Sequence, residues 1–481
     1  MKLLFRILGM VIFLGTAVPS SSASPLPEQY LAFQIFTASP DSETLIQSFP
    51  PLNGTIADQV DRIIRATGTV GSKNRRLGLI VGPVVFGDTD DQVRKLMRDG
   101  FALAHEKNIA IGFHIDDSMF WDRMTDLNQP ENLEWLDWNK TPNTGRRLDW
   151  SSVPTKIRPQ LCFNSPAVEA VVKKRATLIG EEVGRGMKML QVHDQADLFI
   201  GIIAGWETQM GRDFETGKYL GYHALMNQGY NAQHPPADMD QARVRIVQAF
   251  IDLWATSLAE AGVPDEKIYS HTACLSQAVF DAAGFGQPGR WPGSYLETVN
   301  FTPPGASFGA HHRPGFSTYP QFGLLEQIQA QLNRNGNPPW AASEGTAGDP
   351  SLVEKGDSGN SMENYLGNLF NRGAVVVNIY GWGLGPVSNP FRRLAENATS
   401  VAAYQKFLRG ETLASDPPAQ VPSPQFFDKM RSLQKELPPY LAKHGAGKVG
   451  PLYEKLSRNL KTLRYTDAEQ AVDEIFQMIK P

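Results

Sequence analysis

The chain has 481 residues, which is enough for several domains of about 150 residues, although a single (β/α) barrel with insertions can also take up most of this length. A formal net charge of -4 at pH 7 provides no basic field for phosphate groups, so nucleic acid and anionic lipid are not expected as partners. Only Cys162 and Cys274 are present, which excludes a disulfide scaffold and a cysteine-based metal site; one bridge and two separate buried thiols both remain open.

The N-terminus has the order of a secretory signal peptide. Lys2 and Arg6 precede an apolar run over residues 7–18, and small residues follow up to Ala23. This run is too short to span a bilayer, so we expect residues 1–23 to be removed during export to the periplasm or the extracellular space. No later segment is apolar over the length of a membrane helix, and the mature protein is expected to be soluble and not bound to a membrane.

From residue 30 onward, the chain repeats a short apolar run, a polar or glycine-rich loop and a longer stretch with helical periodicity. This order is typical of parallel β/α units. Several of the runs are continuously aliphatic, as expected for strands that are covered on both faces. The sequence therefore predicts an α/β protein, a (β/α)8 TIM barrel with long βα loops. Its eight expected strands are residues 30–36, 77–81, 109–115, 198–204, 268–271, 295–301, 340–343 and 374–380.

The helices between these strands are visible as stretches with apolar residues at helical spacing. Residues 390–408 form a further expected helix that could close the barrel, so residues 24–410 are assigned to the barrel. Residues 411–481 begin with a proline-rich joint and are expected to form a C-terminal helical extension, in which Thr466 and Glu469 have the spacing of a capping box. The helices expected within the barrel are residues 88–107, 167–189, 240–261 and 362–372.

Two acidic residues stand at the ends of expected strands. Glu207 ends the apolar run of the fourth strand, and Glu344 ends that of the seventh. Because the carboxyl ends of barrel strands face a shared opening, the two carboxyl groups are expected to face each other. Cleavage of a glycosidic bond needs one carboxyl group to protonate the leaving oxygen and another to attack the anomeric carbon or activate water. At a separation of about 5 to 5.5 Å, the second group attacks directly and the configuration is retained.

This arrangement resembles the clan A glycoside hydrolases, which are retaining (β/α)8 enzymes with an acid/base Glu after strand four and a nucleophile Glu after strand seven. By that resemblance, Glu207 is the acid/base and Glu344 is the nucleophile of a secreted glycoside hydrolase. It implies cleavage of β-glycosidic bonds in an oligo- or polysaccharide, with no cofactor and no metal. The resemblance covers residues 30–408 and departs from the clan at Trp206, where the clan usually has an Asn that contacts the sugar 2-hydroxyl.

Further residues near the expected strand ends are candidates for sugar contacts, because sugar rings present apolar faces and polar rims. Trp382 resembles the tryptophan beneath the reacting sugar in the clan, with core packing as the alternative, and Tyr380 is a candidate partner of the nucleophile. For His114, Asp116 and Asp117, the alternatives are sugar contact, a buried His–Asp pair, and cation binding by the two acids. The other expected sugar contacts are Trp121, Trp206, Gln209, His271, Asn300 and His311.

Two other functions remain open at this stage. A non-catalytic carbohydrate-binding barrel would use the same aromatic residues, with the acidic groups too far apart for hydrolysis; a carboxyl separation well beyond about 10 Å would favour it. A metal-assisted hydrolase would use His114, Asp116 and His271, and its activity would be sensitive to chelators.

Overall fold

The computed structural model describes most of the chain, except for the N-terminal region and several loops. The expected signal peptide, residues 1–23, lies outside the described residues. Among the residues that the structure describes, no helix has both the length and the apolar character needed to cross a membrane. The described residues are 28–36, 56–72, 74–121, 123–148, 155–283, 293–348, 361–415, 423, 425–461 and 464–479.

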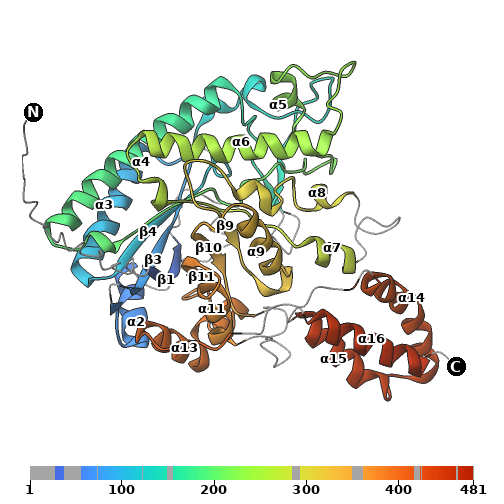
Figure 1. Cartoon of the computed structure of the whole chain (residues 1–481). Helices are drawn as coiled ribbons and strands as arrows, with labels where there is room; N and C mark the ends of the chain where they lie inside the picture. The colour runs from blue at the N-terminus through green and yellow to red at the C-terminus, as the bar shows by residue number, and fades with distance from the viewer. Residues whose placement is uncertain are drawn as a thin grey trace, which may run out of the picture.

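Eight parallel strands form a closed barrel at the centre of the molecule (Figure 1). Their order around the barrel is their order along the chain, and the first strand pairs with the last. The fifth and sixth strands are joined by backbone hydrogen bonds, such as that from Thr272 N to Gly315 O at 3.0 Å. The predicted TIM barrel is therefore confirmed. Its strands are β1 (Gln29–Phe36), β3 (Arg75–Val84), β4 (Ala110–Ile115), β7 (Phe199–Ala204), β8 (Ile268–Ser270), β9 (Gly315–Ser317), β10 (Trp340–Gly345) and β11 (Ala374–Ile379).

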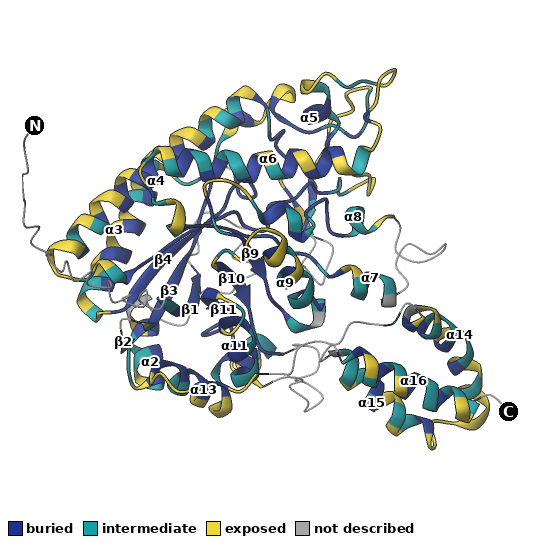
Figure 2. Cartoon of the chain, in the orientation of Figure 1, coloured by how far each residue is buried: buried dark blue, intermediate teal, exposed yellow. Residues whose placement is uncertain are grey.

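Helices surround the barrel, and Figure 2 shows the strands buried while α3, α4 and α6 expose residues on their outer sides. One large apolar cluster fills the layer between strands and helices, and a smaller one lies inside the barrel, because successive side chains of a strand point to opposite faces. The helices are α2 (Ile56–Thr67), α3 (Asp90–Lys107), α4 (Pro166–Val192), α6 (Met239–Glu260), α9 (Leu325–Arg334), α11 (Met362–Phe370), α12 (Pro390–Glu396) and α13 (Ala398–Leu408).

Local capping signals decide where several of these helices begin and end. Thr89 and Gln92 form a reciprocal capping box at the start of α3. The single helix expected over residues 390–408 is instead two helices, because Asn397 accepts a hydrogen bond from Ser400 N at 2.9 Å and caps α13.

The sixth strand is the one barrel strand that was predicted in the wrong place. Residues 295–301 contain the short helix α8 (Tyr295–Thr298), which Ser294 and Glu297 start with a capping box. The actual strand, β9, has three residues and lacks a run of aliphatic side chains. The prediction that Asn300 ends a strand is therefore wrong as well: Asn300 follows α8, with a φ of 48°.

The long segment between β4 and α4 contains small elements of its own, including an antiparallel pair of strands, β5 (Arg146–Leu148) and β6 (Thr155–Ile157). Cys162 lies near the end of this segment, and Cys274 follows β8. Both are free, buried thiols, so the alternative of two separate thiols is the one that the structure shows.

The C-terminal helices α14 (Phe426–His444), α15 (Val449–Lys461) and α16 (Tyr465–Ile479) are present, as predicted. They lie together beside the barrel (Figure 1) and share an apolar core, against which Ala278 of α7 (Gln277–Ala283) also packs. The predicted capping box is wrong, because α16 already begins at Tyr465 and Thr466 lies within it.

Candidate active site

Glu344 lies within β10, the seventh barrel strand, and its side chain is almost fully buried at 7% exposure. The hydroxyl of Tyr319, two residues after β9, donates a hydrogen bond of 2.7 Å to Glu344 Oε1. Burial raises the pKa of Glu344 to about 7, and the hydrogen bond from Tyr319 acts in the opposite direction because it stabilises the charged form. The Glu344 carboxyl group is therefore expected to titrate near neutral pH.

Glu207 follows β7, the fourth barrel strand, and is half-buried. The charges of Glu344 and Glu207 both raise the pKa of Tyr319, beyond the larger effect of burial. The same two carboxyl groups raise the pKa of Tyr380, again after burial. Glu207 and Glu344 thus both lie at the carboxyl end of the barrel, although they are far apart in the sequence.

The hydrogen bond to Glu344 comes from a tyrosine that was not expected from the sequence, while Tyr380 as a partner of the nucleophile stays a prediction. Tyr380 follows β11 and donates its backbone N–H to Gly345 O at 2.8 Å, while its ring packs 4.9 Å from that of Phe391. The hydrogen bond to Glu344 comes from Tyr319, which was not among the predicted site residues. Its signal in the sequence was a position two residues beyond a strand, and this signal was lost with the misplaced sixth strand.

A layer of polar side chains crosses the interior of the barrel. His114 Nε2 lies 3.0 Å from His271 Nδ1, and His114 Nδ1 lies 3.2 Å from Gln34 Oε1, which accepts a hydrogen bond of 2.8 Å from Asn378 Nδ2. All four side chains are at most 1% exposed. Burial lowers the pKa of His114 well below its ordinary value and that of His271 to about 3. Both imidazoles are therefore neutral at physiological pH.

Trp206 lies against this layer, with its ring 4.3 Å from that of His114. It is 3% exposed and belongs to an apolar cluster that also contains Phe36 and Leu384. In this structure His114 therefore contacts both His271 and Trp206 in the interior of the protein. A sugar contact by these three residues remains a prediction.

Asp116 and Asp117 follow β4 and hold loops in place. Asp116 accepts backbone N–H groups from Phe86, Met119 and Phe120 at 3.0, 2.8 and 2.9 Å. Burial, and then the charge of Asp117, raise its pKa to about 7. Asp117 accepts hydrogen bonds from the loop after β7. Within the described ranges, no three His, Cys, Asp or Glu side chains gather as metal ligands do, so His114, Asp116 and His271 form no such group there.

Two predicted aromatic contacts belong to the hydrophobic core. Trp382 is 5% exposed, and its ring lies 5.1 Å from that of Phe33 and 6.4 Å from that of Tyr404 on α13. It therefore packs between the barrel and an outer helix, as the core-packing alternative expects, and a contact with sugar stays a prediction. Trp121 is 2% exposed and donates its indole N–H to Pro159 O at 3.1 Å.

The remaining candidates lie in two different places. Asn300 Nδ2 donates a hydrogen bond of 2.5 Å to Gln209 Oε1, so both residues fix the loop after β7. His311 pairs with Asp265 at 3.1 Å, and both residues precede their strands, β9 and β8. His311 therefore lies at the amino end of the barrel, opposite the acids, and this position does not support its predicted role in sugar binding.

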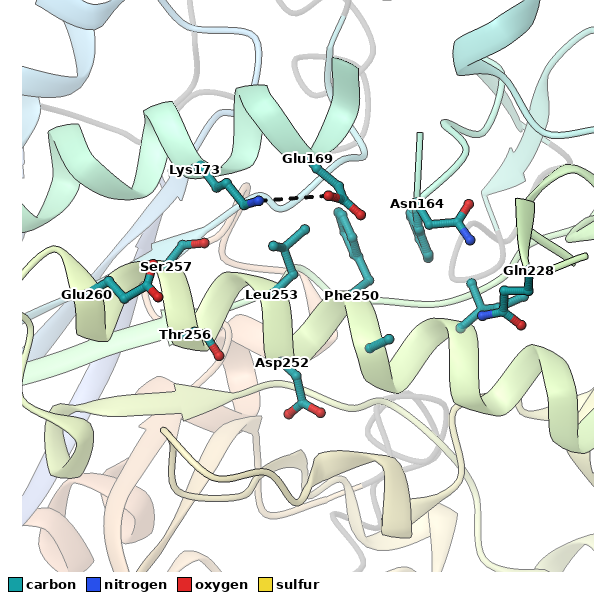
Figure 3. Close-up of a pocket in the computed structure, with 13 residues that line it drawn as sticks. Asn164, Glu169, Lys173, Gln228, Phe250, Asp252, Leu253, Thr256, Ser257 and Glu260 are labelled. Carbon is teal, nitrogen blue, oxygen red and sulfur yellow. Dashed lines mark ion pairs between the residues drawn. The ribbon is translucent and has the colours of Figure 1, made fainter. Parts of the chain in front are cut away.

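A separate cavity of about 430 Å³ lies between α4 and α6 (Figure 3). Glu169 and Lys173 of α4 form an ion pair at 3.8 Å on one side of it, and Figure 3 shows Asp252 pointing away from that pair. Neither Glu207 nor Glu344 lines this cavity, so it is distinct from the group of acids and tyrosines.

No family model matches the chain. No curated protein matches its sequence. Among solved structures, the chain is similar to the catalytic domain of a β-amylase from Paenibacillus polymyxa (9% identity, TM-score 0.44, 82% of this chain and 100% of the other). It is also similar to a β-galactosidase from Marinomonas ef1 (10%, TM-score 0.43, 79% and 59%) and a xyloglucanase from Bacteroides ovatus (12%, TM-score 0.36, 76% and 69%).

Proposed function

We propose that this protein is a retaining glycoside hydrolase that cleaves β-glycosidic bonds of an oligo- or polysaccharide. The observation that carries the proposal is geometric: Glu207 and Glu344 stand at the carboxyl ends of the fourth and seventh strands of one barrel, and Glu344 is buried and accepts a hydrogen bond from Tyr319. Two carboxyl groups at the same opening of a barrel are what this hydrolysis requires.

In the proposed reaction, the carboxylate of Glu344 attacks the anomeric carbon while the bond to the leaving oxygen breaks. Glu207 gives its proton to that oxygen. Water then attacks the anomeric carbon of the glycosyl–enzyme, Glu207 accepts a proton from the water, and the bond from this carbon to Glu344 breaks, which releases Glu344 as a carboxylate. The Tyr319 hydroxyl, 2.7 Å from Glu344 Oε1, stabilises the charged form of the nucleophile before attack and after release.

The proposal is tested with purified protein on a panel of aryl β-glycosides and polysaccharides, beside Glu207→Gln and Glu344→Gln. We expect activity on at least one substrate, a loss of at least about 100-fold in each variant, and a first product with retained configuration by NMR. An inactive wild type, or full activity in Glu344→Gln, overturns the proposal. An inverted product keeps hydrolysis but refutes Glu344 as the nucleophile.

We also propose that the protein is exported, on the basis of the charged and apolar order of residues 1–23. N-terminal sequencing of the mature protein from its native host, together with cell fractionation, tests this proposal. A mature chain that begins near residue 24 outside the cytoplasm supports it, and an unprocessed cytoplasmic chain contradicts it.

A further inference from the structure

The loop that carries Glu207 has an unusual backbone. Glu207 itself has a φ of 58°, and Gly205 has a φ of 110°. A positive φ is unfavourable for a residue with a side chain. Such a conformation persists only where neighbouring groups hold it, so the bonds on either side of Glu207 determine where its carboxyl group lies.

Those bonds converge on one carboxylate. Asp117 Oδ2 accepts a hydrogen bond of 2.6 Å from the Thr208 hydroxyl, and Asp117 Oδ1 accepts one of 3.3 Å from Trp206 N. Asp117 thus holds the residues directly before and after Glu207. It is 2% exposed, and it follows β4, the strand that pairs with β7. We refer to these two hydrogen bonds of Asp117 as the clamp. The clamp connects the ends of β4 and β7, which are neighbouring strands.

Gly205 leaves the space that this clamp needs. A Cβ atom at Gly205 would lie 2.5 Å from the Thr208 hydroxyl oxygen, which is closer than the two atoms can approach. Thr208 is fixed on its other side as well, because its carbonyl oxygen accepts a hydrogen bond of 3.0 Å from Thr302 Oγ1. The hydroxyl of Thr208 is therefore directed at Asp117.

We propose that Asp117 is a positioning residue that sets the backbone of Glu207, so that the Glu207 carboxyl group meets the leaving oxygen. This inference rests on the proposed function and deepens it. Asp117 acts through Trp206 and Thr208 and does not touch the substrate. This positioning role takes the place of the sugar contact that the sequence suggested for Asp117.

The test compares kcat/KM of the wild type and Asp117→Ala on two glycosides of the same sugar. A phenyl leaving group needs a proton, whereas a dinitrophenyl group departs without one. We expect a loss of about 10- to 100-fold on the phenyl glycoside and less than about 3-fold on the dinitrophenyl glycoside. Thr208→Val is expected to shift the same ratio in the same direction, and it serves as the second variant if Asp117→Ala does not fold.

Two further variants separate positioning from charge and from general stability. The Asn side chain of Asp117→Asn keeps a carbonyl oxygen that accepts from Trp206 N, and its amide N–H can donate to the Thr208 hydroxyl oxygen. This variant is therefore expected to keep most of the activity. Asp213 is the matched control. It is 1% exposed and accepts hydrogen bonds of 2.9 Å from both Thr216 N and Thr216 Oγ1. Asp213→Ala is expected to lower Tm without changing the ratio between the two glycosides.

Equal losses on both glycosides in Asp117→Ala overturn the inference, as does a loss in Asp117→Asn as large as in Asp117→Ala. A wild type without glycosidase activity refutes the proposed function, but the clamp can then still be judged from a crystal structure of Asp117→Ala or Thr208→Val. A φ of Glu207 that stays near the wild-type value in the variant refutes the clamp, and a changed φ supports it.

Discussion

Replacement of Glu344 by Gln is predicted to stabilise the protein at pH values above about 7. Burial raises the pKa of Glu344 from 4.5 to about 7, so between these values the folded protein keeps a proton that the unfolded chain has released. Stability therefore falls as pH rises through this window, and the penalty remains constant above it. At about 1.4 kcal/mol for each pH unit, the window corresponds to about 3 kcal/mol. A Gln side chain avoids this penalty because it has no ionisable proton, and its carbonyl oxygen can still accept from Tyr319.

The assay is thermal unfolding of wild type and Glu344→Gln from about pH 4.5 to about pH 8. We expect the Tm of the variant to exceed that of the wild type by a few degrees at about pH 8, and the difference to shrink towards about pH 4.5. Glu454→Gln, on the exposed surface of α15, is the control and is expected to follow the wild type at every pH. A difference between wild type and Glu344→Gln that does not change with pH would refute the reasoning.

Three further predictions follow from the same structure. Tyr319→Phe removes the hydrogen bond that lowers the pKa of Glu344, so the acidic limb of the pH profile of kcat/KM is expected to move to higher pH; an unchanged limb speaks against this contact. Trp382→Ala is expected to lower the free energy of unfolding by about 3–5 kcal/mol, as measured with urea, and to leave KM unchanged; a raised KM at normal stability would return Trp382 to the substrate site. Cys162 and Cys274 are buried and free, so a thiol reagent is expected to label them only after denaturation, and rapid labelling of the native protein contradicts their burial.

The sequence predicted the barrel because most of its strands are strongly apolar. Residues of β7 and β11 are buried without exception, which requires continuous aliphatic runs that stand out from the surrounding helices. The count of strands placed Glu207 on the fourth and Glu344 on the seventh, and the structure has the same count. This count was correct although the sixth strand was misplaced, because one strand still lay between β8 and β10.

The sixth strand was missed because its residues carry little local preference. β9 is held by backbone hydrogen bonds to both neighbouring strands. These are tertiary interactions, and they cannot be predicted from the sequence of a three-residue segment. In contrast, Ser294 and Glu297 do have the spacing of a capping box, which predicts the helix that replaces the expected strand. The error then removed Tyr319 from the candidate site and placed His311 at the wrong end of the barrel.

The roles of other residues could not be predicted from the sequence because they depend on the direction in which each side chain points. Asp116 and Asp117 are adjacent, yet Asp116 accepts from its own loop and from Phe86, whereas Asp117 reaches the loop after β7. Trp382 follows a strand end, as a substrate contact would, but its ring lies among Phe33 and Tyr404. Which way a side chain turns at a strand end is set by the packing around it.

The neutral imidazoles inside the barrel have a consequence for any titration of activity. Histidine is the side chain that ordinarily changes charge near neutral pH, but burial prevents this for His114 and His271. The phenols of Tyr319 and Tyr380 also stay uncharged, because burial raises their pKa. Near neutral pH these four groups therefore keep the same charge. A pH-dependent step in turnover would then originate in carboxyl groups, even though two histidines lie within the same barrel.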